Sequence, residues 1–158
     1  MNSEQELFAT TAITSFRLNG QFLAVAEELA RPAGLTAAWW QVLGAVLRAP
    51  LPVAGIARAM GITRQSVQRI ADLLVDKGLA EYRPNPAHRR AKLVAVTEAG
   101  LAAVRRIDPQ HKVMSERLVD ELGREQLALT VEVLTKLSAG MEGLAAGAPR
   151  SPCTGASC

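Results

Sequence analysis

The residues best suited to chemistry form a short polar run near the middle of the chain. Hydrogen-bonding side chains follow one another there: Thr63, Arg64, Gln65, Ser66, Gln68 and Arg69. In the major groove of DNA, glutamine can pair with adenine and arginine with guanine through two hydrogen bonds each. Apolar residues recur through the run at helical spacing: Val67, Ile70, Ala71 and Leu74. This pattern predicts one helix whose outer face meets base edges, with a merely solvated face as the alternative.

Small residues ahead of this run predict a helix-turn-helix. Ala57 falls where two crossing helices touch, and Gly61 falls where the chain must turn sharply with positive φ. Thr63 is suited to cap the second helix, because its hydroxyl can accept a hydrogen bond from a free amide. We therefore expect helices over 53–60 and 64–77, with a small apolar core from Ile56, Met60 and Ile62.

The spacing of apolar residues changes from helical to alternating after Gly78. Residues 79–83 and 91–97 have the pattern of two strands, and a Pro-rich basic segment joins them. The segment ends with Arg89 and Arg90, which predict a hairpin wing with a cationic tip. Arginine is attracted to narrow minor grooves, so this wing is suited to lie along DNA.

Charge is distributed unevenly along the chain. Residues 48–92 contain nine cations and three anions, a net charge of +6, whereas the remainder carries nine cations and twelve anions, a net −3. A basic centre between acidic flanks is the electrostatic pattern of a polyanion-binding protein, although a solvated charged face gives the same imbalance.

Composition excludes several classes of protein. The chain is 49% hydrophobic and 21% charged, which is typical of a globular domain. The first residues show no basic secretory leader, and no apolar stretch is long enough to span a bilayer, so we expect a cytoplasmic protein. The only histidines, His88 and His111, form no metal-ligand or nucleophile–base pair with other residues, so we expect no enzyme, no cofactor and no metal. Cys153 and Cys158 both fall in a small, polar tail over 147–158 that we expect to be disordered.

Amphipathic helices are predicted on both sides of the basic centre. Ser3 and Glu6 are spaced as a capping box for a helix that ends at Arg31. A second helix is expected over 37–48, and after Glu98 a long helix is interrupted at Asp108-Pro109. The last helix carries an apolar seam that suits a partner helix: Leu127, Val131, Leu134, Leu137, Met141 and Leu144.

The run from Leu35 to Gly100 resembles the MarR family of winged helix-turn-helix regulators. The matching segments are residues 34–36 with Trp40 and Leu43, then 56–69, 74–79, 89–91 and 94–100. The resemblance implies a mainly α fold with a small β-hairpin wing. It divides the chain into an N-terminal dimerisation helix, a DNA-binding lobe, C-terminal dimerisation helices and a tail, over 1–31, 36–97, 98–146 and 147–158.

The resemblance also implies a function. A homodimer would place two recognition helices in successive major grooves of a pseudo-palindromic double-stranded operator and would repress a nearby promoter. A small ligand between the dimerisation helices and the lobe would release the DNA. The implied DNA contacts are the six polar residues from Thr63 to Arg69 together with Arg89 and Arg90. One position departs from the family pattern, because His88 stands where the wing usually has aspartate, so Arg90 lacks that carboxylate partner.

Two adjacent tryptophans raise a separate question. Trp40 is expected in the core, whereas Trp39 is expected to face the first helix. There Trp39 either packs or lines a pocket for a small aromatic or apolar effector, with Phe16 or Phe22 nearby. Two other functions stay open: a winged helix that docks on protein, and a ligand-binding dimer without DNA binding. The polar recognition face favours DNA over both. Neither the operator, the regulated genes, the effector nor the sign of regulation follows from the sequence.

Overall fold

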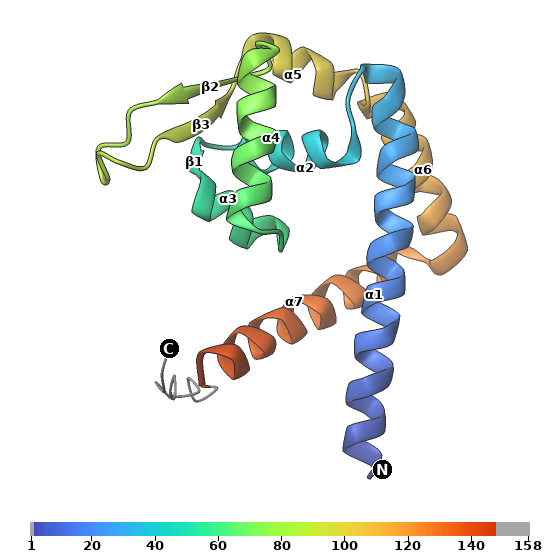
Figure 1. Cartoon of the computed structure of the whole chain (residues 1–158). Coiled ribbons are helices and arrows are strands. Elements are labelled where there is room, and N and C mark those ends of the chain that lie inside the picture. Colours follow the sequence, from blue (N-terminus) through green and yellow to red (C-terminus); the bar gives the residue numbers. More distant parts are fainter. Residues whose placement is uncertain (1, 148–158) are drawn as a thin grey trace, which may run out of the picture. The chain divides into compact units, whose positions relative to one another are not determined.

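The computed structural model describes residues 2–147 and divides the chain into two units at Lys112 and Val113. Helices dominate, and Figure 1 shows a hairpin of two strands extending from them. The helices are α1 (Ser3–Ala30), the 3₁₀ turn η1 (Arg31–Ala33), α2 (Ala37–Val46), α3 (Val53–Met60), α4 (Arg64–Asp76), α5 (Glu98–Arg105), α6 (Asp108–Leu122) and α7 (Arg124–Gly147). The strands are β1 (Leu51–Pro52), β2 (Ala80–Arg83) and β3 (Leu93–Val96). The expected winged helix-turn-helix is confirmed.

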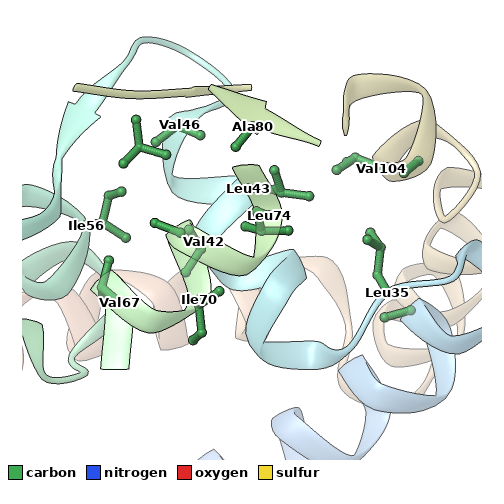
Figure 2. Packing of buried hydrophobic residues seen from close by; sticks show 14 of the residues in the cluster. Leu35, Val42, Leu43, Val46, Ile56, Val67, Ile70, Leu74, Ala80 and Val104 are labelled. Carbon is green, nitrogen blue, oxygen red and sulfur yellow. The ribbon is translucent and has the colours of Figure 1, made fainter. Parts of the chain in front are cut away.

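One apolar core holds the winged region together. Figure 2 shows buried side chains from α2, α3, α4 and the sheet converging on it. Fully buried members include Val42, Leu43, Ile56, Val67, Leu74 and Val94. Ala103, Val104 and Ile107 join the same core, so it continues past the expected boundary at residue 97. Because so many elements share this core, it fixes the position of α4 relative to the wing.

The sheet has three strands rather than the two expected. Its order is β1-β3-β2, and both neighbouring pairs are antiparallel. Within the hairpin, Tyr82 of β2 pairs with Val94 of β3. On the opposite side of β3, Leu51 of β1 pairs with the same Val94. The two-residue strand β1 is too short to show any alternation in the sequence, which is why it was missed.

A close contact joins the wing to α5. The Thr97 hydroxyl donates to the Gly78 carbonyl at 2.6 Å and accepts from the Gly100 amide at 3.1 Å, which confirms Thr97 as the cap of α5. An ideal Cβ on Gly100 would lie 2.0 Å from the Leu79 carbonyl oxygen. Only glycine therefore permits this approach between the start of α5 and the start of β2.

Two local predictions are corrected. The capping box of α1 is formed by Asn2 and Gln5, not Ser3 and Glu6: the Asn2 side chain accepts from the Gln5 amide, and the Gln5 side chain accepts from the Asn2 amide. Helix α2 ends at Val46, two residues earlier than expected, before Pro50. The break at Asp108-Pro109 is confirmed, since α5 ends at Arg105 and α6 begins at Asp108.

The C-terminal helices differ from the winged region in burial. Neither α6 nor α7 has a buried residue in the described part of the chain. Within residues 2–147, none of the helices combines the length and apolar character that crossing a bilayer demands. Except for Gly147, which ends α7, the tail assigned to 147–158 lies outside the described residues, as do Cys153 and Cys158.

Candidate nucleic-acid interface

The turn between α3 and α4 has the expected geometry. Gly61 adopts φ of 64°, and the Ile62 amide donates to the Ala57 carbonyl at 3.2 Å. Ala57 is 7% exposed, so its small side chain lies at the contact between the two helices. These three residues direct α4 across α3 and place the beginning of α4 at the surface.

Two of the predicted DNA-contacting residues fix the start of α4. Thr63 Oγ1 accepts from the Ser66 amide at 3.1 Å, and the Thr63 hydroxyl donates to Ser66 Oγ at 2.9 Å. The Thr63 hydroxyl is therefore engaged in capping the helix, and Ser66 Oγ accepts the Thr63 proton. The remaining free amides at this helix start favour a phosphate group.

Helix α4 has a buried apolar face and an exposed polar face. Val67, Ile70, Ala71 and Leu74 are buried, whereas Arg64, Gln65, Gln68 and Arg69 are exposed. Such a helix has its apolar side occupied and offers a face of donors and acceptors to the outside. Its dimensions suit the major groove of B-DNA.

The wing tip is shaped by hydrogen bonds to the side chain and the backbone of Asn85. Asn85 Oδ1 accepts from the Ala87 amide at 3.1 Å, and the His88 amide donates to the Asn85 carbonyl at 3.2 Å. Arg89 and Arg90 are exposed, and neither makes an ion pair with any residue of the described part. Both guanidinium groups are thus available to phosphate or to a minor groove.

A groove between α4 and the wing brings many of the predicted residues together. This α4–wing groove has a volume of about 660 Å³ and is lined by Arg64, Gln65, Gln68, Asp72, Tyr82, Arg90 and Lys92, with the start of α3. Arg69 lies beside Gln65 and Gln68 in a second depression along α4, of about 500 Å³. Arg89 instead lines a separate depression on the wing with Asn85. Four of the eight predicted residues thus line the α4–wing groove: Arg64, Gln65, Gln68 and Arg90. Arg89 does not line this groove, although Tyr82 and Lys92 line both the groove and the depression of Arg89.

A hydrogen-bonded triad across this groove was not predicted from the sequence. The Tyr82 hydroxyl donates to Asp72 Oδ1, and Gln68 Nε2 donates both to Asp72 Oδ1 at 3.0 Å and to the Tyr82 oxygen at 2.9 Å. Burial, together with the hydrogen bond and negative charge of Asp72, raises the pKa of Tyr82 to about 12. Lys92 Nζ lies 5.7 Å from the centroid of the Tyr82 ring. Alternation along β2 was the available signal, because it places Tyr82 on the same face as the buried Ala80.

The three residues assigned to an effector pocket lie in different surroundings. Phe22 lines a cavity of about 330 Å³ between α1, α2 and α3, where Trp40, Leu23 and Met60 are its apolar neighbours. Phe16 is 76% exposed, and neither Phe16 nor Trp39 lines this cavity. Trp39 is half-buried beneath Lys77, whose Nζ lies 5.6 Å from the ring centroid. Trp40 also meets His111 edge to face, with ring centroids 5.7 Å apart.

Comparison with known proteins decides the family. A sequence model of the MarR family matches residues 33–91, the span from η1 to the wing tip. A Mycobacterium tuberculosis protein, Uncharacterized protein Rv2011c, is 38% identical over 122 residues, which cover 77% of this chain and 85% of the relative. The chain belongs to the MarR family.

Solved structures of MarR regulators share the fold at low sequence identity. The M. tuberculosis regulator MosR in complex with DNA superposes with a TM-score of 0.70 at 20% identity, over 84% of this chain and 96% of that one. CouR from Rhodococcus jostii, bound to p-coumaroyl-CoA, gives a TM-score of 0.71 at 21% identity, over 81% and 91%. MarR proteins are DNA-binding transcriptional regulators and not enzymes, and this chain has their winged-helix fold.

Proposed function

We propose that this MarR protein is a homodimeric repressor that binds a pseudo-palindromic operator and is released from it by a small molecule. The observation that carries the proposal is the polar and cationic surface of α4 and the wing. It presents Arg64, Gln65, Gln68 and Arg69 beside Arg90 on one rigid core. A protein-docking winged helix would be expected to expose aromatic or aliphatic anchors on this face.

Each lobe is proposed to bind one half-site. Helix α4 enters the major groove, where Gln65 and Arg69 meet base edges, and the wing lies along the neighbouring minor groove with Arg90. Two lobes of a symmetric dimer then require half-sites about one helical turn apart. Occupying a promoter in this way blocks transcription by steric exclusion alone, in the cytoplasm where bacterial DNA is found. MosR, which was crystallised with DNA, supports DNA binding by this fold.

The dimer is proposed to form through the terminal helices. Apolar side chains on α7 stay exposed in the single chain, with Val131 at 60%, Leu134 at 39% and Met141 at 45%. The exposed apolar residues of α1 include Leu7, Phe8 and Ile13. Several exposed apolar side chains on one helix favour a protein interface.

The cavity between α1, α2 and α3 is the proposed effector site. Phe22, Trp40 and Met60 give it an apolar wall, and Asn19 and Gln41 supply polar groups that can orient a ligand. Because α1 and the helix-turn-helix both contribute, a ligand there changes the position of the lobe relative to α1. CouR, which was solved with p-coumaroyl-CoA, supports control by a small molecule. Quenching of tryptophan fluorescence on ligand addition tests this assignment.

Selection of bound duplexes from random DNA tests the proposal as a whole. We expect an enriched inverted repeat with centres roughly 10 base pairs apart, bound more weakly as salt rises. Arg64→Ala and Gln65→Ala are expected to lower affinity for the enriched site, and Lys136→Ala on α7 serves as the matched control. Absence of any enriched duplex at modest ionic strength would favour the protein-docking or ligand-binding alternatives.

A further inference from the structure

Helix α1 is fixed to the winged region at its C-terminal end. Ala30, the last residue of α1, is 0% exposed in the shared core, and Leu35 beyond the turn η1 is buried there as well. Arg106, which follows α5, donates from Nη2 to the Ala33 carbonyl of η1 at 3.3 Å. No residue of α1 other than Ala30 is buried in the single chain.

One directional contact joins α1 to α2. The partly buried Glu27 accepts through Oε2 from the Ala37 amide at 2.7 Å, at the first position of α2. The first amides of a helix have no partner within it, and the helix dipole favours a carboxylate at this end. Thr36 caps a different amide, that of Trp39, so Glu27 does not duplicate the usual cap. In the part of the chain over 2–147, the Glu27 bond is the only hydrogen bond between these two helices.

Packing on the N-terminal side of Glu27 restrains α1 less. The cavity of about 330 Å³ lies there, and Ala26, Leu23 and Asn19 of α1 line it opposite residues of α2. A cavity leaves room for the two helices to change their separation. The angle between α1 and the winged region therefore depends on the buried end of α1 and on the Glu27 bond.

A small change of this angle becomes a large displacement along α1. An α-helix rises about 1.5 Å per residue, so Phe8 lies about 28 Å from Glu27 along the helix. A tilt of about 10° displaces Phe8 by roughly 5 Å, which exceeds the rise of about 3.4 Å per base pair of DNA. Phe8 is among the exposed apolar residues of the proposed dimer surface, so the angle of α1 sets the distance between the two lobes.

We propose that Glu27 is a positioning residue that determines which separation of half-sites the dimer accepts. It holds α2, and with it the recognition helix α4, at one angle to α1, and it acts without touching DNA. Without this bond each lobe turns about the buried end of α1, so operators of neighbouring spacing become similar in affinity. The inference rests on the homodimeric operator binding proposed above.

Operators that differ only in half-site separation test this role. The half-site enriched by the wild-type protein is built into inverted repeats at the selected separation, one base pair shorter and one base pair longer. For wild-type protein we expect the selected separation to bind roughly ten-fold more tightly than the other two. For Glu27→Ala we expect these differences to fall below about three-fold. Gel-shift titrations measure each affinity.

Two variants separate the hydrogen bond from the charge. Glu27→Gln keeps an oxygen that can accept from the Ala37 amide, so it should retain the wild-type preference. Glu28→Ala removes the same charge from an exposed neighbouring position and should also retain it. Loss of folded protein lowers binding to all three operators by the same factor, so a purely structural role leaves the preference unchanged.

The outcomes distinguish this inference from the function on which it rests. The inference is overturned if Glu27→Ala keeps the wild-type preference, or if Glu27→Gln or Glu28→Ala loses it. Failure of the wild-type protein to bind any inverted repeat would instead overturn the proposed function, and the inference with it.

Hydrogen exchange in the wild-type protein tests the contact even if Glu27→Ala does not fold. Ala37 and Ala38 are the first two residues of α2, so neither amide has a partner within the helix. Because the Ala37 amide donates to Glu27, we expect it to exchange at least about ten-fold more slowly than the Ala38 amide. Nuclear magnetic resonance measures both rates, and equal rates would overturn the inference.

Discussion

The winged region and the terminal helices of this protein differ in how far they bury their apolar side chains. Between Ala30 and Ile107 only two large aliphatic side chains, Leu47 and Leu73, are exposed, and most of the others are buried in one shared core or packed against it. Helix α7, in contrast, has no buried residue, and in α1 only Ala30 is buried. Both terminal helices are nevertheless rich in leucine, and α1 also contains all three phenylalanines of the chain.

The difference indicates how the two regions are stabilised. Isolated helices are marginal in water, so a long helix with exposed apolar side chains depends on surface supplied by something else. In the winged region that surface comes from the same chain, whereas for α7 we propose that a second copy provides it. Substitutions in the two regions should therefore be distinguished by whether their effects depend on protein concentration.

Leu134→Glu should produce the largest effect, because it places a charge in the proposed seam of α7. We expect the dimer to dissociate at micromolar concentration and operator affinity to fall by about 1,000-fold, towards non-specific binding. The winged region should keep its fold, since Leu134 lies outside that core. Light scattering coupled to size-exclusion chromatography measures the mass, and a gel-shift titration measures affinity.

The matched control for that change is Lys136→Glu on the same helix. Lys136 is exposed and pairs with Glu132, so this substitution introduces a carboxylate away from the seam. It should cost only a few tenths of a kcal/mol through like-charge repulsion. Equal dissociation of the two variants, or a dimeric Leu134→Glu protein, would contradict the assignment of this seam.

Leu74→Ala and Leu73→Ala compare a buried and an exposed leucine at adjacent positions on α4. Leu74 is 0% exposed and Leu73 is 41% exposed. Removing the buried side chain leaves a cavity, so Leu74→Ala should lower the free energy of unfolding by about 3 kcal/mol, and Leu73→Ala by less than about 1 kcal/mol. Urea denaturation at several protein concentrations measures both values. Similar losses for the two would mean that another surface covers Leu73.

Gly100→Ala and Gly44→Ala compare two helical glycines with different surroundings. A Cβ at Gly100 would meet the Leu79 carbonyl, whereas a Cβ at Gly44 has nothing within 4 Å. We expect Gly100→Ala to lower the free energy of unfolding by about 2 kcal/mol through overpacking, and Gly44→Ala to raise it by about 0.5 kcal/mol through lower chain entropy. Thermal unfolding followed by circular dichroism measures both. A neutral Gly100→Ala would show that the wing and α5 separate easily.

The sequence was sufficient for the winged region because local and tertiary preferences agree there. Thr63 caps α4, Gly61 adopts positive φ, and the apolar residues of α4 lie on one face, all as predicted. The sequence did not predict strand β1 or the triad of Gln68, Asp72 and Tyr82. Both depend on residues brought together by the hairpin: Val94 pairs with Leu51, and Tyr82 lies 14 positions from Gln68. The periodicity of a sequence does not reveal contacts between segments that lie far apart in the chain.

The cavity beside Phe22 shows the same limit. Helical spacing separates the directions of Trp39 and Trp40, and it correctly shows that they point differently. The prediction that Trp39 is the one that faces α1 is wrong. In the structure Trp40 lines the cavity with Phe22, while Trp39 packs beneath Lys77.

The smallest expected effect comes from comparing two arginines of the wing, Arg90 and Arg83, by substituting each with alanine. Arg83 forms an ion pair with Glu81 at 2.6 Å, whereas Arg90 has no such partner in the described residues. Loss of Arg90 should therefore weaken operator binding by roughly five-fold at low salt and reduce the slope of log affinity against log salt by about 0.9. Arg83→Ala should change that slope less, because Glu81 already offsets its charge. Titrations of both variants across a salt series measure the slopes, and equal slopes for Arg90→Ala and wild type would show that the exposed guanidinium at the tip contacts no phosphate.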